Sequence, residues 1–174
     1  MATEKSKTKE LFESLDGIAL EILQIISSLN EIEVNTIAFE DSWTPAQLIS
    51  HVTKSNKGIA QALEMEGKPV DRDPAKRAQE LKRMFLDFTK KYKSPEFILP
   101  TEDFYKKEKV IADLKKSIEQ ITELRSKVNL SEVINVPLFG EITRLELLYF
   151  VLYHTQRHIR QLKNITVILT RKQE

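Results

Sequence analysis

Hydrophobic residues recur at helical spacing in five stretches of the chain, and no stretch of comparable length alternates as a β-strand does. The first stretch predicts a helix over about residues 6–30, because its apolar residues are spaced four and three apart and form one stripe. These residues are Leu11, Leu15, Ile18, Ile22, Ile25 and Leu29. The last stretch predicts a helix from Thr143 to about Asn164, and the pattern leaves the conformation of residues 165–174 open.

The second stretch carries four signals for the start of a helix. Thr44 is a favourable N-cap, Pro45 suits the first helical position, and Gln47 completes a capping box. Trp43 and Leu48 stand at the two positions of a hydrophobic staple. We therefore expect a helix from Pro45 to about residue 66, with Gly67 as its stop signal.

A long connection with four prolines follows, over residues 67–101. Inside it, Asp73 is expected to cap a subsidiary amphipathic helix that Pro74 opens. Its apolar face comprises Leu81, Met84, Phe85, Phe88 and Tyr92. The next periodic segment, about residues 103–128, predicts another long helix with one apolar face: Ile111, Leu114, Ile118, Ile121 and Val128. A capping box at Thr143 and Glu146 then marks the start of the last helix.

Four long helices plus one in a connector predict an all-α four-helix bundle formed by a single domain, residues 1–174. The connector of roughly 35 residues between helix 2 (residues 45–66) and helix 3 (residues 103–128) is long enough to return the chain to its starting end. Helices 2 and 3 can then run parallel, which gives an up-down-down-up topology. In that arrangement helix 2 and helix 4 (residues 143–164) are antiparallel.

Composition narrows the classes of function. The chain of 174 residues has 27 Lys and Arg against 26 Asp and Glu, so its charge gives no reason to expect nucleic acid as a partner. The absence of cysteine excludes disulfides, thiolate metal ligands and a cysteine nucleophile. The N-terminus lacks a signal-like apolar stretch, and the longest apolar run, residues 147–153, is too short to span a membrane. A cytoplasmic protein that does not bind membranes is expected.

The three histidines of the chain form the most informative pattern. His154 and His158 are four residues apart, so both lie on one helix face, at a spacing with which two imidazoles bind one metal ion. His51 lies about 9 Å into helix 2, and the pair lies about 15 and 9 Å back from the end of helix 4. With those helices antiparallel, all three imidazoles meet at one level of the bundle.

A three-histidine site with an open position suits a divalent ion, with zinc or nickel favoured. Single histidines at a core edge are usually just packed and hydrogen-bonded, but three buried together without a metal are hard to satisfy. Gln47, Ser55 and Gln161 are candidates for lining the pocket. Thr155 stands where a zincin helix has its Glu, and no acidic residue has an obvious spacing for a general base. The catalytic residues are therefore left unassigned.

Two segments resemble the DinB-like (DinB/YfiT) superfamily of metal-dependent enzymes, particularly its branch of bacillithiol transferases. Residues 43–51 match the Trp-[Ser/Thr]-Pro segment that opens the helix of the first ligand. Residues 137–143, followed by residues 154–161, match the family's Pro-x-x-Gly-x-[Leu/Ile]-Thr segment and its His-x-x-x-His-x-x-Gln helix. The resemblance covers about residues 8–164.

The resemblance implies an up-down-down-up bundle, a nickel or zinc ion on His51, His154 and His158, and a homodimer. It also implies hydrolase, isomerase or thiol-transfer chemistry on a small molecule, such as a thiol and an electrophile. The leading hypothesis is a metal-dependent enzyme that activates water or a substrate thiol. The rival is a non-catalytic, metal-stabilised bundle that acts as a binding or stress-related protein.

The aromatic residues of the connector and Trp43 allow two interpretations each. Phe85, Phe88, Tyr92 and Phe97 are more typical of core or dimer surface than of a substrate pocket, although a connector across a bundle end could form a lid. The staple position of Trp43 favours packing over stacking on a ligand. The lysine pairs at residues 90–91, 106–107 and 115–116 are interspersed with acids, so a solvated helix face is expected.

Overall fold

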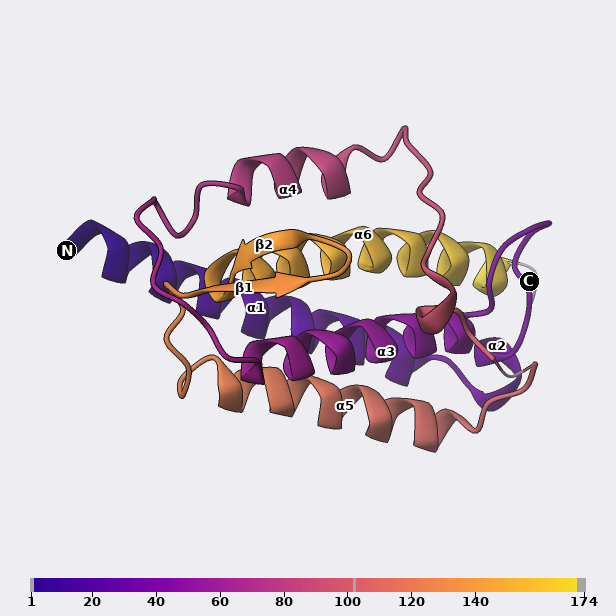
Figure 1. Ribbon diagram of the computed structural model, residues 1–174. Helices are drawn as coiled ribbons and strands as arrows, with labels where there is room; N and C mark the ends of the chain where they lie inside the picture. The colour runs from indigo at the N-terminus through magenta and orange to yellow at the C-terminus, as the bar shows by residue number, and fades with distance from the viewer. Residues whose placement is uncertain (1, 102, 172–174) are drawn as a thin grey trace.

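The computed structural model describes residues 2–101 and 103–171 and contains the four long helices of the predicted bundle. These are α1 (Ala2–Ser28), α3 (Pro45–Glu64), α5 (Lys107–Leu124) and α6 (Arg144–Arg171). α1 and α6 run one way along the bundle while α3 and α5 run the other way (Figure 1). The up-down-down-up topology and the antiparallel arrangement of α3 and α6 are therefore confirmed.

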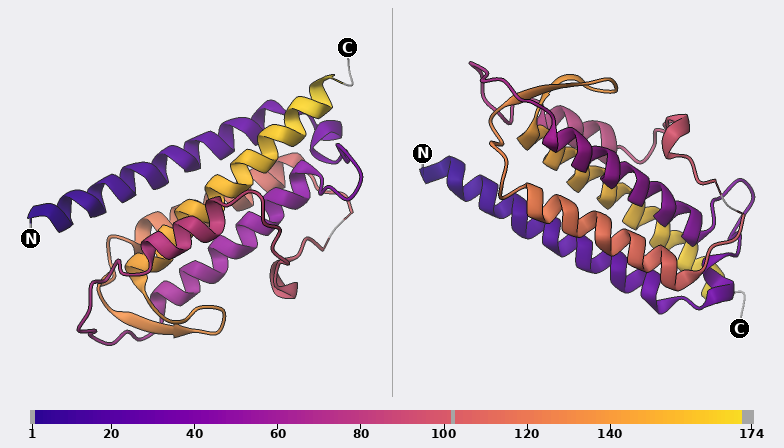
Figure 2. Two further views of the ribbon diagram at one scale, coloured as in Figure 1. Left: turned by 90° about the horizontal axis from the view of Figure 1, so that it is seen from above. Right: turned by 60° about the horizontal axis from the view of Figure 1, so that its bottom comes forward.

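Short elements connect the long helices. The single turn α2 (Glu31–Val34) follows α1, and the connector between α3 and α5 contains α4 (Ala78–Leu86) and the 3-10 turn η1 (Glu96–Ile98). α4 packs on α6, and η1 packs on α3. An antiparallel hairpin of β1 (Val133–Val136) and β2 (Gly140–Thr143) precedes α6. The hairpin, α4 and η1 lie on one side of the bundle, away from α1 and α5 (Figure 2).

The predicted cap of α3 is present in full. The Gln47 amide nitrogen donates to the Thr44 hydroxyl at 3.2 Å, and the Thr44 amide nitrogen donates to the Gln47 side chain at 3.1 Å. Pro45 occupies the first turn, and the helix ends at Glu64, two residues before the predicted end. The second predicted capping box is also confirmed, because Thr143 and Glu146 exchange the same two bonds at 2.9 and 3.0 Å.

Several predicted boundaries were wrong. The connector helix begins at Ala78 rather than Pro74, because the Asp73 side chain caps a separate turn by accepting from the amide of Ala75. It ends at Leu86, so Phe88 and Tyr92 lie beyond it. The helix expected over 103–128 spans residues 107–124. Residues 165–171, left open by the sequence, continue α6, and Ile165 and Leu169 are buried.

Two further corrections follow from local geometry. The predicted first helix stops at Ser28, because Asn30 starts a new turn with its own capping box. Near its end the buried residue is Ile26 rather than Ile25, since a strict four-three spacing drifts around a helix of 3.6 residues per turn. The hairpin was missed because its two four-residue strands are too short for an alternating pattern to stand out.

Within the described residues, no helix is both long and apolar enough to cross a membrane. The helices instead share one core. Its largest fully buried side chains come from α1, the link after α1, α3, α4, α5, β2 and α6: Ile22, Ile26, Leu29, Leu48, Ile49, Leu63, Leu81, Leu114, Ile142, Leu147, Leu148 and Leu162. The antiparallel pair α3 and α6 then positions the histidines.

Candidate metal centre

The three histidines meet at one point, as their spacing predicts. The Nε2 atom of His51 lies 3.3 Å from that of His154 and 3.1 Å from that of His158, and the latter two are 3.0 Å apart. All three side chains are buried. They are the one group of three or more potential metal ligands found among the residues that the structure describes.

The distances fit one divalent ion. Zinc binds imidazole nitrogen at about 2.0–2.1 Å, so two ligand nitrogens at coordination angles between a right angle and the tetrahedral angle lie about 2.9–3.4 Å apart. The three Nε2 separations, 3.0–3.3 Å, fall within that interval. The geometry of the donor set therefore suits a metal ion bound by three histidines.

Hydrogen bonds at the outer ring nitrogens support the same conclusion. The Ile98 carbonyl can only accept, so His51 donates to it through Nδ1 at 3.1 Å. His158 places Nδ1 2.6 Å from Oε1 of Gln161, which also accepts. Each neutral ring then has an unprotonated Nε2, and two nitrogen lone pairs face each other across 3.1 Å. A cation between them turns this repulsion into coordination.

The surroundings keep the imidazoles in the neutral form that binds metal. Burial lowers the pKa of His51, against the opposing effect of its bond to Ile98. Burial also lowers the pKa of His158, to about 3. The pKa of His154 lies well below its ordinary value, because of burial and then the neighbouring histidines. At neutral pH the site therefore presents neutral ligands with little competition from protons.

Aromatic rings enclose the site. The ring centroids of Trp43 and His51 are 5.1 Å apart, and Phe150 stacks on His154 at 5.0 Å. The ring of Phe85, from α4, stands edge-on to His154 at 5.9 Å. Trp43 packs against the core as expected, but it also borders the histidines.

A cavity of about 1150 Å³ opens in front of the histidines, between the α3–α6 pair and the layer formed by α4, η1 and the hairpin tip. Phe85, Tyr92 and Phe97 line it, and Phe85 also packs against the core as expected. Phe88 is not among the lining residues and lies under the guanidinium of Arg160.

The connector is attached over this cavity by cationic side chains. Arg157 donates from Nη1 to the carbonyls of Phe85 and Asp87, both at 3.1 Å, and from Nη2 to the carbonyl of Lys90. Lys54 of α3 donates to the carbonyl of Leu99 at 2.6 Å. The side chains of α3 and α6 thus hold the segment that covers the site.

The three predicted pocket residues have different positions. Ser55 is buried and lines the cavity, one turn after His51. Gln161 also lines it and contacts His158 directly. Gln47 instead closes the cap of α3 and is not among the lining residues. The Ile98 carbonyl was missed, because a backbone acceptor gives no signal in the side-chain sequence.

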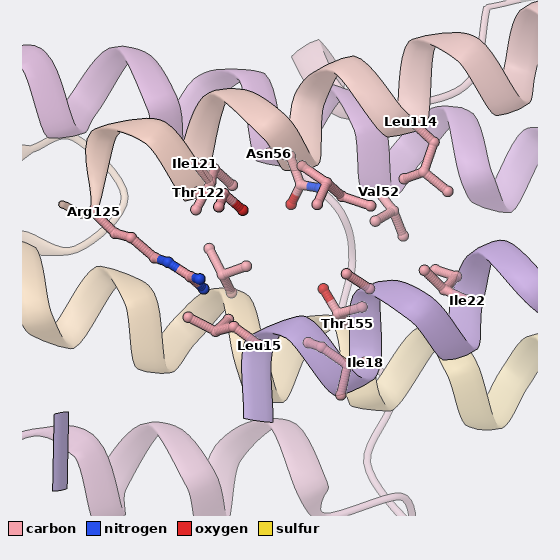
Figure 3. A pocket seen from close by; sticks show the side chains of 13 residues that line it. Leu15, Ile18, Ile22, Val52, Asn56, Leu114, Ile121, Thr122, Arg125 and Thr155 are labelled. Atoms are coloured by element: carbon pink, nitrogen blue, oxygen red, sulfur yellow. The ribbon is translucent and has the colours of Figure 1, made fainter. Parts of the chain in front are cut away.

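A second, small cavity of about 30 Å³ lies in the bundle interior among α1, α3, α5 and α6 (Figure 3). On α3 it is lined by Val52 and Asn56, whereas the large cavity is lined by His51 and Ser55. Thr155 borders the small cavity from α6. The two cavities therefore lie on different faces of α3, and the small one belongs to the core rather than to the histidine site.

Comparison with known proteins agrees with this arrangement. The family model described as the DinB superfamily matches residues 15–162. The uncharacterized protein YuaE of Bacillus subtilis is 23% identical over 150 residues, which cover 84% of this chain and 91% of that protein.

Two solved structures have a similar fold. The four-helix bundle protein TT2238 superposes with a TM-score of 0.59 at 19% identity, covering 90% of this chain and 98% of its own. YfiT from Bacillus subtilis, described as a probable metal-dependent hydrolase with an unusual four-helix bundle topology, gives a TM-score of 0.62 at 15% identity. That match covers 95% of this chain and 89% of YfiT.

Proposed function

The chain belongs to the DinB superfamily, and from this premise we propose that it is a metal-dependent enzyme of the hydrolase or thiol S-transferase type. The observation that carries the proposal is the convergence of three histidine Nε2 atoms within 3.3 Å of one another. They converge at the wall of a cavity large enough for a small-molecule substrate. The description of the fold neighbour YfiT as a probable metal-dependent hydrolase points the same way.

His51, His154 and His158 would hold the ion, and zinc or nickel suits a set of three neutral imidazoles. When bound, such an ion supplies a Lewis acid that polarises a substrate carbonyl and acidifies water or a thiol. Since the chain has no cysteine, a sulfur nucleophile has to arrive with the substrate.

The remaining residues of the site orient and shield the ligands. The Ile98 carbonyl and the Gln161 carboxamide fix two imidazole rings through their Nδ1 atoms. Trp43, Phe85 and Phe150 pack around the rings. No carboxylate joins the histidine cluster among the described residues, so we assign no side chain as general base.

The experiment begins with metal analysis of purified protein, followed by titration of the metal-free protein with Zn²⁺ and Ni²⁺. We expect close to one ion per chain and a rise in melting temperature on binding. Changing His154 to Ala should abolish both effects, whereas Gln156→Ala on the same helix should not. Absence of binding by the unaltered protein would overturn the proposal.

The loaded protein is then assayed with small thiols plus electrophiles and, separately, with ester and amide substrates. Turnover that requires the ion and disappears in the His154→Ala variant supports an enzyme. Conversion of thiol–electrophile pairs alone identifies a transferase, and conversion of esters or amides alone identifies a hydrolase. A bound ion with no turnover in either series contradicts the enzymatic part of the proposal.

A further inference from the structure

The large cavity is elongated along α3, and His51 lies near one end of its α3 lining. Along α3 its lining runs from Leu48 to Met65, a span of about 26 Å at the rise of an α-helix. His51 is only one turn from the first of these residues and about 21 Å from the last. On α6 the lining extends from Phe150 past the histidine pair to Ile165. We call the part of the cavity beyond Ser55, towards the hairpin, the arm.

Apart from Gln61 and Arg77, the side chains that line the arm are apolar. Residues of α3, α4, the hairpin tip and α6 contribute: Ile59, Ala62, Met65, Leu81, Met84, Phe85, Val136, Pro137, Leu138, Phe139 and Phe150. Three of them, Met65, Met84 and Leu138, are large hydrophobic side chains that stay about two-fifths or more exposed, at 42, 39 and 55%. Exposed apolar surface gathered in one concavity is typical of a ligand site.

Small residues leave the floor of the arm open. Ser55, Gly58 and Ala62 follow His51 on the same face of α3, at spacings of four, three and four. A Cβ atom added at Gly58 would meet no atom within 4 Å. The volume beside this face is therefore available to a ligand, and it is continuous with the histidine site.

Positive charge gathers at the histidine end. Arg157 lies between the two histidines of α6, and its hydrogen bonds go to neutral backbone carbonyls. Its guanidinium also lies 5.3 Å from the ring of Tyr92, whose neighbours Lys91 and Lys93 line the cavity and form no ion pair among the described residues. A fourth cation of the lining, Arg77, lies at the hairpin, where it donates to the carbonyls of Phe139 and Glu141 and pairs with Glu80. Asp41 is the one carboxylate found in the described lining.

We propose that the cavity takes a long-chain carboxylate, with its straight apolar chain in the arm and its anionic head at the histidine end. The apolar lining matches the chain, and Lys91, Lys93 and Arg157 match the charge of the head. The inference rests on the proposed function for the role of the histidines. The arm and the cations, however, recognise the ligand through residues that are not metal ligands.

Calorimetric titration with hexanoate, octanoate, decanoate and laurate tests the arm, on metal-free and on metal-loaded protein. Each added methylene that is buried should strengthen binding about threefold to fourfold until the arm is full. Dodecanol, which has the chain of laurate without the charge, should bind about tenfold more weakly. Equal affinities across the chain-length series would overturn the proposal.

A matched pair of glycine variants tests whether the alkyl chain of the ligand lies in the arm. Gly58→Leu places a side chain in the arm, whereas Gly17→Leu makes the same change on the exposed side of α1, where an added Cβ also meets nothing. Both variants should fold, because leucine is the better helix former. Gly58→Leu should weaken laurate about tenfold or more and leave hexanoate unchanged, and Gly17→Leu should change neither. An unchanged laurate affinity in Gly58→Leu would exclude the arm.

The double variant Lys91→Glu plus Lys93→Glu tests whether these lysines recognise the anionic head of the ligand. Laurate should bind about tenfold more weakly, while dodecanol should bind as before. An equal loss for both ligands would contradict recognition of the charge. Metal binding without any chain-length dependence would defeat this inference and leave the proposed function standing. Chain-length-dependent binding by a protein that holds no metal would defeat the proposed function instead.

Discussion

Gln161 Oε1 lies 2.6 Å from Nδ1 of His158, and the Nε2 atom of the same ring faces the other two histidines. One side chain thus determines which nitrogen of His158 carries the proton and which has a free lone pair. Gln161 is exposed at the edge of the cavity, whereas His158 is only 7% exposed. Gln161 can therefore be changed without disturbing the core.

Changing Gln161 to Leu should weaken metal binding about tenfold or more, because His158 loses the acceptor that fixes its ring and tautomer. Competition with a chromophoric chelator measures this affinity. Gln161→Glu, which keeps an acceptor at the same place, should retain it. Gln156→Leu on the same helix serves as the control, and an equal loss in that variant would mean that the effect is structural.

Trp43 should report occupancy of the site, because it is the single tryptophan of the chain and its ring centroid lies 5.1 Å from that of His51. Open-shell Ni²⁺ should strongly quench its fluorescence, while closed-shell Zn²⁺ should not. A fluorescence titration measures the response, and the His154→Ala variant should remove it. Nickel binding that leaves the emission of Trp43 unchanged would place the ion elsewhere.

Glu146→Gln should destabilise the fold by about 2 kcal/mol at neutral pH. Its buried carboxylate accepts bonds from Arg72 at 2.7 and 2.8 Å and from the amides of Arg77 and Thr143, both at 2.9 Å. The glutamine would leave the charge of Arg72 without a partner. Urea unfolding measures the difference. Glu123→Gln, at an exposed pair with Lys127, should leave the free energy of unfolding nearly unchanged.

The effect of Glu146 should depend on pH. Burial acts to raise its pKa, but the bonds from Arg72, Thr143 and Arg77 outweigh burial and leave the pKa lowered. A depressed folded-state pKa contributes stability above the unfolded value of about 4.3, and that stability is lost as the pH falls through the folded value. The gap between the unaltered protein and Glu146→Gln should therefore be constant near neutrality and shrink in acid. A gap that widens in acid would contradict this assignment.

Alanine at two glycines should change stability in opposite directions. At Gly67 the added Cβ would lie 2.6 Å from Oε2 of Glu132 and 2.8 Å from Nη1 of Arg144, where Arg144 also binds the carbonyls of Leu63 and Met65. Gly67→Ala should therefore destabilise by about 1–3 kcal/mol. Gly17→Ala, in an open position of α1, should stabilise by about 0.5–1 kcal/mol. Thermal unfolding of both variants compares the two signs directly.

Local patterns of the sequence were sufficient to predict the four long helices and their arrangement. The capping boxes at Thr44 and Thr143 involve residues three positions apart, so they can be read from the chain directly. The level of the three histidines also followed from the sequence, once the long connector implied that α3 and α6 are antiparallel. Only helical rise and spacing entered that prediction.

The enclosure of the site was decided by the tertiary structure. The Ile98 carbonyl lies 47 residues from His51, and Phe85 lies 69 residues from His154 along the chain. Nothing in the local pattern links either pair, because the path of the connector depends on Arg157 of α6, which donates to its carbonyls. Periodicity determines which face of a helix is buried, and only packing between distant segments determines what covers that face.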